Sequence, residues 1–470
     1  MRLDLAEIVR CLGCARDVKV TDGSVTVTSV VTDSREAVAG SLFVCIAGER
    51  VDGHDYAARA VEQGAVAVLA SRPLEGLSVP VLLVQDTVRA VAALWRGKSS
   101  ARVVGITGSA GKTTVKELLA HVLSRRGKTA CNALNLNNQV GMPLCMLKTD
   151  GDEDFWVFEA GISHEGDMDE LGAILQPDLA LILNVGAAHT EGLGERGVAW
   201  HKSHLLAHLA PEGQALVSAD YDDLVREARA VFGDVLFFTA SGRPLSYRAA
   251  YAGCSDGVHG QYRLWLDGRP CDVIAPFRGD YGTENCIAVA AAAHMLGLTA
   301  EEIAAGFADA QLPPQRFARS RRGNWDIVDD TYNANPLSMA RMLDAAAESA
   351  QKRPFVVVLG EMRELGSVAD REHERLGRHL AQLRPVLVFW RGGHADAVRD
   401  GLEHGLYTGK FLPVDSGEAF VQALREHLPA ETGEQGGLML FKGSRGNHLE
   451  ELLEALEQSD WLPGSRTESL

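Results

Sequence analysis

The sequence predicts an α/β protein of three domains: a small α/β domain, a central parallel-sheet domain and a C-terminal Rossmann-like α/β domain. A chain of 470 residues is longer than one hydrophobic core usually organises. From residue 101 onward, short apolar strands alternate with helical patterns, as in doubly wound sheets. Polar segments near residues 98 and 316 interrupt these patterns. We therefore expect domains over residues 1–98, 99–316 and 317–470.

Composition and charge exclude several classes of protein. Lys and Arg number 46 against 63 Asp and Glu, and the net charge of −17 disfavours nucleic acid and anionic membranes as partners. No stretch approaches the roughly 18 apolar residues of a membrane span, and the charged start does not resemble a signal peptide. Eight cysteines do not make a disulfide framework in a chain of this length. We expect a monomeric cytoplasmic protein with no nucleic-acid partner and no membrane insertion.

The first domain combines short helices with short strands. Its expected strands span residues 25–32, 42–46, 65–69 and 81–84. Ser34, Arg35 and His54 lie in loops between these strands, where a ligand is commonly held. Loop residues whose charges are simply solvated would give the same pattern, so both interpretations stay open.

The clearest functional signal is a glycine-rich turn between a strand and a helix. Residues 101–106 are mostly apolar and rich in β-branched side chains, and apolar residues recur at helical spacing after residue 114. Glycines in such a turn let backbone N–H groups approach a polyphosphate, while Lys112 reaches a terminal phosphate and Thr113 ligates Mg²⁺. The general pattern has glycine where this chain has Ile106, so a plain strand-to-helix turn is the alternative. The candidate phosphate-binding residues are Thr107, Gly108, Ser109, Ala110, Gly111, Lys112 and Thr113.

Polar residues follow the next strands of the central domain. Glu159 ends the apolar strand 155–159, and His189 comes after the strand 179–185. Because the ligand crevice of a doubly wound sheet lies beyond such strand ends, both side chains are expected to face the phosphate loop. A carboxylate there is a usual Mg²⁺ ligand, and a histidine is a less usual one. Lys202 lies in a helical segment, where a solvated lysine is the ordinary interpretation.

Other candidates lie on loops and in the last domain. An amide-rich loop before residue 143 suits a polar ligand, and an alanine-rich helix over residues 288–296 must pack closely against a neighbour. Several strands of the last domain end in polar groups, and such strand ends converge on one face of a sheet. The candidates from these segments are Asn137, Asn138, Asn285, Arg316, Asp330, Tyr332, Asn333 and Asn335.

Taken together, these stretches resemble the Mur ligase family of peptidoglycan synthesis. The resemblance runs through the whole chain. Its motifs are Thr32–Arg35, Thr107–Thr113, Asn135–Asn138, Ala187–Gly192 and Asp330–Pro336. The last motif is typical of the member that adds D-alanyl-D-alanine, rather than of members that add D-Glu, diaminopimelate or lysine.

The resemblance implies an ATP-dependent ligase that joins D-alanyl-D-alanine to UDP-N-acetylmuramoyl-tripeptide through an acyl phosphate. The first domain would hold the UDP-sugar through Ser34, Arg35 and His54, the second ATP and two Mg²⁺ ions, and the third D-alanyl-D-alanine. It further implies that Asn285, Arg316 and Asp330 contact ATP. The remaining substrate contacts would be Asn137, Asn138, Tyr332, Asn333 and Asn335. The catalytic set would be Lys112, Glu159, His189 and Lys202.

The resemblance also implies a metal-ligand set. Thr113 and Glu159 would hold one Mg²⁺ and His189 the second. Lys202 stands where family members carry a carbamylated lysine, whose anionic oxygens suit Mg²⁺.

Three positions depart from the family pattern. Tyr281-Gly282 replaces a usual His-Asn pair, His204 stands two residues after Lys202 where Glu is common, and Glu361 stands where Asp is common. Two alternatives therefore stay open. One is a sibling amino-acid-adding ligase or a folate polyglutamylating enzyme. The other is an inactive homologue that only binds nucleotide.

Overall fold

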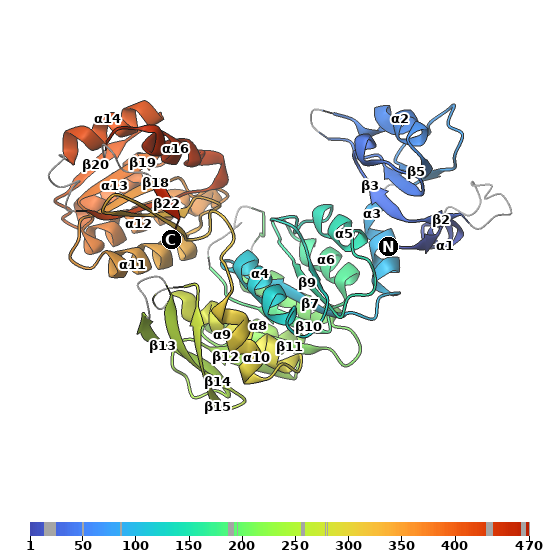
Figure 1. The fold of residues 1–470 in the computed structure, drawn as a ribbon, viewed down its shortest axis with the longest axis horizontal. Coiled ribbons are helices and arrows are strands. Elements are labelled where there is room, and N and C mark those ends of the chain that lie inside the picture. Colours follow the sequence, from blue (N-terminus) through green and yellow to red (C-terminus); the bar gives the residue numbers. More distant parts are fainter. Residues whose placement is uncertain are drawn as a thin grey trace.

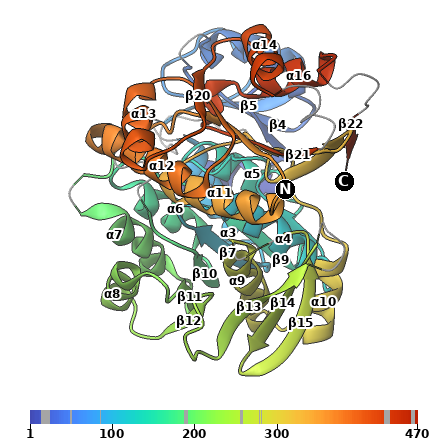
Figure 2. The ribbon, with the colours of Figure 1, turned by 90° about the vertical axis from the view of Figure 1, so that its left-hand side faces the viewer.

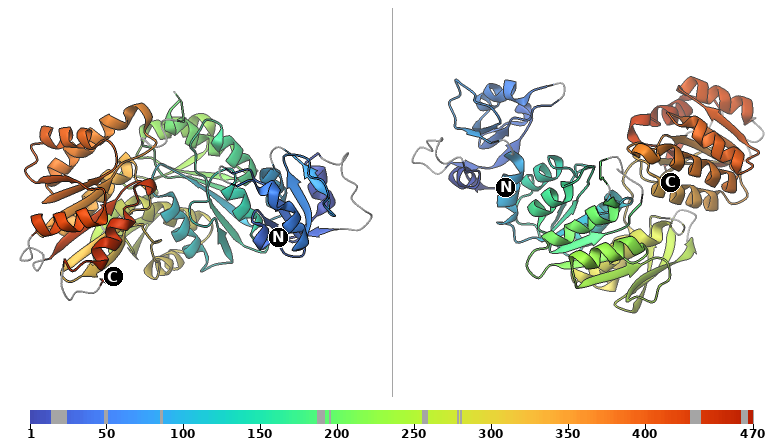
Figure 3. Two further views of the ribbon diagram at one scale, coloured as in Figure 1. Left: turned by 90° about the horizontal axis from the view of Figure 1, so that it is seen from above. Right: turned by 180° about the vertical axis from the view of Figure 1, so that it is seen from behind.

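The structure is a computed structural model that describes residues 1–13, 25–48, 51–84, 87–186, 192–194, 196–254, 259–277, 279, 281–428, 436–461 and 467–469. Three domains are each built around their own sheet, and this confirms the predicted three-domain α/β architecture. The N-terminal and C-terminal domains lie at opposite ends of the central domain (Figures 1 and 3). In the described part of the chain, no helix has the length and apolar character needed to cross a membrane.

The N-terminal domain contains a parallel sheet of four strands. Across the sheet the strands are β3 (Ser29–Val31), β4 (Ser41–Val44), β5 (Ala65–Ala70) and β6 (Val81–Leu83). Helices α1 (Leu5–Cys11) and α2 (Ala57–Glu62) flank short strands and turns. The single strand expected over residues 25–32 is instead two, because β2 (Thr26–Val27) pairs with β1 (Leu3–Asp4) while β3 joins the sheet.

Helix α3 (Thr87–Arg96), which the sequence analysis missed, attaches the N-terminal domain to the central one. Trp95 Nε1 donates a buried hydrogen bond to Thr149 Oγ1 at 2.8 Å. Arg96 pairs with Asp178 at 3.1 Å and donates to the Leu175 carbonyl at 3.0 Å. Because these contacts tie the end of α3 to the central domain, the join near residue 98 is anchored at its start.

The central domain contains a nine-stranded sheet in the order β15-β14-β13-β12-β11-β10-β7-β9-β8. Strands β8 to β13 pair in parallel, and β13, β14 and β15 form an antiparallel meander. The bounds are β7 (Arg102–Thr107), β8 (Thr129–Cys131), β9 (Phe155–Glu159), β10 (Leu179–Ile182), β11 (Gln214–Ser218), β12 (Val235–Thr239), β13 (Tyr247–Cys254), β14 (Gly260–Leu266) and β15 (Arg269–Ala275).

Alternate side chains of this sheet enter two separate cores. Val103 on β7 belongs to the core beneath α3, α5 (Gly141–Leu147) and α6 (Asp167–Leu175). Val104 and Ile106 belong to the core beneath α4 (Lys112–Leu123), α9 (Tyr281–Met295) and α10 (Ala300–Ala308). Helices α7 (Gly197–Ser203) and α8 (Asp222–Val231) complete the domain. Every residue of α9 from Gly282 to Ala293 is buried, so small side chains allow it to pack closely on all sides.

The C-terminal domain contains a seven-stranded sheet in the order β20-β19-β18-β21-β17-β16-β22. Strands β20 to β17 are parallel, and β16 and β22 are antiparallel to their neighbours. The strands are β16 (Ala318–Arg322), β17 (Trp325–Asp330), β18 (Phe355–Gly360), β19 (Leu387–Arg391), β20 (Lys410–Pro413), β21 (Gly437–Lys442) and β22 (Thr467–Ser469). The helices are α11 (Pro336–Ala350), α12 (Ala369–Leu383), α13 (Ala395–His404), α14 (Gly417–His427) and α16 (Glu450–Gln458). Helix α11 lies on the side that faces the central domain (Figures 1 and 2).

Candidate functional site

A cavity of about 930 Å³ lies where the central and C-terminal domains meet. The phosphate loop and the end of β9 form its central-domain wall, and the segments after β17 and β21 form the opposite wall. It therefore brings together most of the residues selected from the sequence in these two domains. Those that line it are Ser109, Ala110, Gly111, Lys112, Thr113, Asn137, Asn138, Glu159, Asn285, Arg316, Asp330, Tyr332, Asn333 and Asn335.

The phosphate loop folds as a tight turn between β7 and α4. Gly111 adopts φ of +81° immediately before the helix, and a Cβ there would lie 2.6 Å from Asn285 Oδ1. Helix α4 starts at Lys112, so its free N–H groups and the positive end of its dipole face the cavity. Lys112 Nζ donates to the Gly108 carbonyl at 2.8 Å. Burial lowers the pKa of Lys112, Arg316 lowers it further, and Glu159 opposes the shift.

An oxygen-rich cluster lies at the start of α4. Thr113 Oγ1 donates to Glu159 Oε2 at 2.8 Å and accepts from Arg316 at 3.0 Å. Asn137 Nδ2 donates to the other oxygen of Glu159 at 2.7 Å. A hydroxyl beside a buried carboxylate is a donor set of the kind that Mg²⁺ prefers, so these residues fit the expected metal site.

Lys202, on α7, is buried rather than solvated. Burial and the neighbouring Lys112 ammonium hold the pKa of Lys202 well below its usual range, although Glu159 opposes the shift. A lowered pKa favours the neutral amine, which is the form that reacts with CO₂. His204, which stands where the family commonly has Glu, has partners nearby. Its Nδ1 lies 3.2 Å from Asp169 Oδ1, and its ring packs on Trp200. His189 lies outside the described residues.

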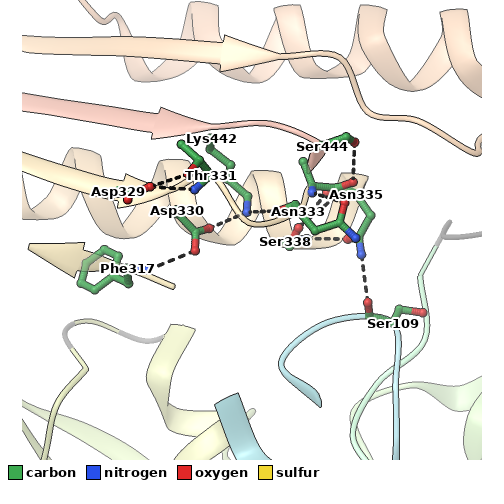
Figure 4. A network of polar contacts seen from close by, with 11 residues as sticks. Ser109, Phe317, Asp329, Asp330, Thr331, Asn333, Asn335, Ser338, Lys442 and Ser444 are labelled. Carbon is green, nitrogen blue, oxygen red and sulfur yellow. Dashed lines mark hydrogen bonds and ion pairs between the residues drawn. The ribbon is translucent and has the colours of Figure 1, made fainter. Parts of the chain in front are cut away.

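The residues after β17 connect the two walls (Figure 4). Asp330 accepts from Lys442 Nζ at 2.5 Å and from the Phe317 N–H at 3.1 Å. Asn335 caps α11 by accepting from the Ser338 N–H at 2.9 Å, and its Nδ2 donates to the Ser109 carbonyl at 2.9 Å. The last contact joins the C-terminal domain directly to the phosphate loop.

Two neighbouring residues also shape this wall. The Arg316 guanidinium lies 4.1 Å from the centre of the Tyr332 ring. The Asn333 side chain accepts from the Ala334 N–H at 2.8 Å, and its carbonyl accepts from Lys442 Nζ at 3.0 Å. Tyr332 and Asn333 therefore both face the cavity beside the Asp330–Lys442 pair.

Tyr281 and Gly282 form the first turn of α9, which starts earlier than the alanine-rich pattern predicts. The Tyr281 ring packs between Phe277 and Phe317, with centroid separations of 5.9 and 5.2 Å. Burial raises the pKa of the Tyr281 hydroxyl well above its usual range, so it stays protonated. A Cβ on Gly282 would lie 2.4 Å from the Tyr262 hydroxyl. A larger residue does not fit there, and this explains the departure at that position.

The N-terminal candidates do not line this cavity. His54 is buried, with Nδ1 at 2.5 Å from Asp52 Oδ1 and Nε2 accepting from the Ser71 N–H at 3.1 Å. Arg35 is exposed and paired with Asp33, while Ser34 is buried in the adjoining turn. Both ring nitrogens of His54 thus have partners within the domain, and they fix the loop that carries it.

Sequence reasoning missed three residues that support the phosphate loop. Asn184 follows β10, Glu284 lies in the first turn of α9, and Arg341 lies on α11. All three are joined by hydrogen bonds. The position of Asn184 just beyond a strand end was the one available signal, because polar residues there face the ligand crevice.

Comparison with known proteins identifies the family. The models that match describe the Mur ligase family, catalytic domain (residues 26–98), the Mur ligase middle domain (106–293) and the Mur ligase, glutamate ligase domain (315–445). The chain is 35% identical over 446 residues to the UDP-N-acetylmuramoyl-tripeptide–D-alanyl-D-alanine ligase of Escherichia coli, covering 93% of this chain and 95% of the relative. The enzyme of the same name from Synechocystis is 34% identical over 443 residues, 92% of each chain.

Solved structures agree with the sequence matches. MurF from Acinetobacter baumannii superposes with a TM-score of 0.84 at 30% identity, covering 97% of this chain and 99% of that one. MurF from Thermotoga maritima in complex with ADP gives 0.78 at 28% identity, covering 91% and 97%. The chain therefore belongs to the Mur ligase family.

Proposed function

We propose that this chain is a monomeric, cytoplasmic ATP-dependent ligase that joins D-alanyl-D-alanine to UDP-N-acetylmuramoyl-tripeptide. The products are UDP-N-acetylmuramoyl-pentapeptide, ADP and phosphate. The observation that carries the proposal is the cavity in which the phosphate loop faces the strand ends of the C-terminal domain. Relatives that bear this ligase's name match more than 90% of the chain, and a structurally similar MurF is in complex with ADP.

Each domain takes one substrate in this proposal. Residues 1–98 hold the UDP-sugar, with Ser34, Arg35 and His54 on its loops. Residues 99–316 hold ATP on the phosphate loop, and residues 317–470 bring D-alanyl-D-alanine. The supporting observation is that Asn335 and Arg341 of the C-terminal domain donate hydrogen bonds to Ser109 and Glu284 of the central domain, so ATP and D-alanyl-D-alanine would meet between them.

The chemistry needs an activated carboxyl group. The tripeptide carboxylate attacks the ATP γ-phosphate, ADP leaves, and an acyl phosphate remains. The amine of D-alanyl-D-alanine then attacks the acyl carbon, and phosphate leaves. Lys112 and the amides of the phosphate loop stabilise the charge on the transferring phosphoryl group, and the C-terminal domain excludes water from the acyl phosphate.

Thr113 and Glu159 are the residues that fit a Mg²⁺ ion, with His189 and a carbamate of Lys202 as proposed ligands of a second. Bound Mg²⁺ would offset the negative charge of the phosphates. The low pKa of Lys202 supports the carbamate, since only the neutral amine adds CO₂.

The test is phosphate release from ATP, measured with UDP-N-acetylmuramoyl-tripeptide in the presence and absence of D-alanyl-D-alanine. Release that requires both, with formation of the pentapeptide, is the expected result. Lys112→Ala should abolish it, whereas Lys128→Ala, at an exposed lysine paired with Asp150, should not. Release driven by another amino acid would assign the chain to a sibling ligase. ATP binding without any release would indicate an inactive homologue.

A further inference from the structure

Helix α11 of the C-terminal domain touches the phosphate-loop region at three points. Asn335, which caps the helix, donates to the Ser109 carbonyl at 2.9 Å (Figure 4). Leu337 Cβ lies 3.1 Å from where a Cβ on Gly186 would stand, and Gly186 exchanges hydrogen bonds with Ser109. Arg341, one turn beyond Leu337, pairs with Glu284 of α9 at 2.6 Å.

The contact made by Arg341 extends to the phosphate loop through two buried residues. Arg341 Nη1 and Asn184 Nδ2 both donate to Glu284 Oε2, at 2.6 and 2.8 Å. Asn184 Oδ1 accepts the Ala110 N–H at 2.7 Å, and its Nδ2 donates to the Ala110 carbonyl at 3.1 Å. We call Arg341, Glu284 and Asn184 the interdomain bridge. It ends on both backbone groups of one phosphate-loop residue.

The charges in the interdomain bridge make its parts interdependent. The Glu284 side chain is 4% exposed, against 28% for Arg341, so the carboxylate relies on Arg341 to offset its charge. If Arg341 were lost, Glu284 would keep the Asn184 amide and the Tyr221 hydroxyl as donors but would have no cation beside it, which favours binding a proton or turning toward water. Either change removes or weakens the acceptor that orients the Asn184 amide, which in turn holds the Ala110 N–H.

We propose that Arg341 is a positioning residue that acts through Glu284 and Asn184 to set the geometry of the phosphate loop according to the position of the C-terminal domain. The inference rests on the proposed function, since it takes ATP as the ligand of the loop. The loop adopts its binding geometry when α11 is docked, and an undocked C-terminal domain leaves Glu284 without its cation. Productive ATP use is thereby linked to the domain that brings the acceptor dipeptide.

The test uses the full chain and the Arg341→Gln variant. We expect kcat/KM for ATP to fall about tenfold or more, the effect of losing a hydrogen bond to a charged group. KM for D-alanyl-D-alanine should stay within about twofold of the wild-type value. The substitution alters hydrogen bonds to the backbone of the phosphate loop and not contacts with the dipeptide. Arg341→Lys should recover part of the loss, since lysine supplies the charge without the planar fork.

The decisive variant is Arg341→Met combined with Glu284→Gln. Glutamine keeps an oxygen for Asn184 and needs no counter-charge, so the double variant should use ATP better than Arg341→Met alone. This rescue is not expected if Arg341 contributes by touching ATP itself. The double variant also covers the case in which Arg341→Gln does not fold.

Arg353→Gln is the matched control. Arg353 pairs with Asp326, also 4% exposed, at 2.8 Å, but this pair lies within the C-terminal domain. The Arg353→Gln variant should therefore leave KM for ATP unchanged. Wild-type values for Arg341→Gln, or a double variant no better than Arg341→Met, would overturn the inference. If the wild-type chain itself failed to release phosphate, the proposed function would fail instead.

Discussion

Gly111 and Gly166 form a natural pair for testing what the phosphate loop requires. Both are helix N-caps in the left-handed region, with φ of 81° and 86°, at the starts of α4 and α6. Alanine in this region costs about 1–2 kcal/mol at either position. They differ in their surroundings, since a Cβ meets nothing within 4 Å at Gly166 but lies 2.6 Å from Asn285 Oδ1 at Gly111.

Gly166→Ala should therefore lower the Tm of the central domain by the backbone cost alone, about 2–8 °C. Gly111→Ala should lower it further and should also weaken ATP binding at least tenfold, because Asn285 must move from its place against the loop. Thermal unfolding and titration with a fluorescent ATP analogue measure the two effects. Equal Tm values together with equal ATP affinities for the two variants would refute the reasoning.

Two further predictions concern Lys202 and Asn335. The pKa of Lys202 in the folded state lies below its unfolded value of about 10.4, so the native state binds fewer protons than the unfolded state. The free-energy cost of burying Lys202 is therefore largest at low pH and decreases as the pH rises toward the unfolded pKa. Lys202→Met should thus raise Tm at pH 7 in bicarbonate-free buffer by at least about 2 °C, with a smaller gain near pH 10, and a pH-independent gain would contradict this. Asn335→Ala should lose the helix cap, about 1 kcal/mol, and the Ser109 contact, whereas Asn335→Ser should keep the cap and lose only the contact. ATP turnover should fall similarly in both variants while Tm falls only in the alanine variant; normal turnover in the serine variant would remove any role for the contact.

Much of the central site was predictable because its signals are local. The strand, the glycine turn and the helix that form the phosphate loop occupy consecutive residues, and Glu159 ends a strand whose apolar run is unmistakable. Strand ends in a parallel sheet share one edge, so the pairing of Thr113 with Glu159 follows from topology.

The remaining features depend on residues that meet only in the folded molecule. Arg341 sits on an amphipathic helix where an exposed arginine is ordinary, and its partner Glu284 is 57 residues away in sequence. The need for glycine at position 282 comes from the hydroxyl of Tyr262, which lies on β14 of the antiparallel meander and leaves no room for a Cβ. The end of helix α3 could not be predicted because the polar segment that starts at Arg96 is typical of a flexible linker. In the folded molecule, one carboxylate and two backbone carbonyls of the central domain accept hydrogen bonds from Arg96.

The alanine run of α9 limits which substitutions the helix can accept without disturbing the phosphate loop. Alanine side chains let a helix approach its neighbours more closely than larger residues do, and here the whole run is buried between α4, α10 and the sheet. The same helix presents Glu284 and Asn285 at its head, against the phosphate loop. Thickening the helix anywhere along the run would push its head away from the loop without altering any residue there. The small side chains along α9 thus determine how close its first turn lies to the phosphate loop, and so the width of the nucleotide site, although most of them lie far from that site.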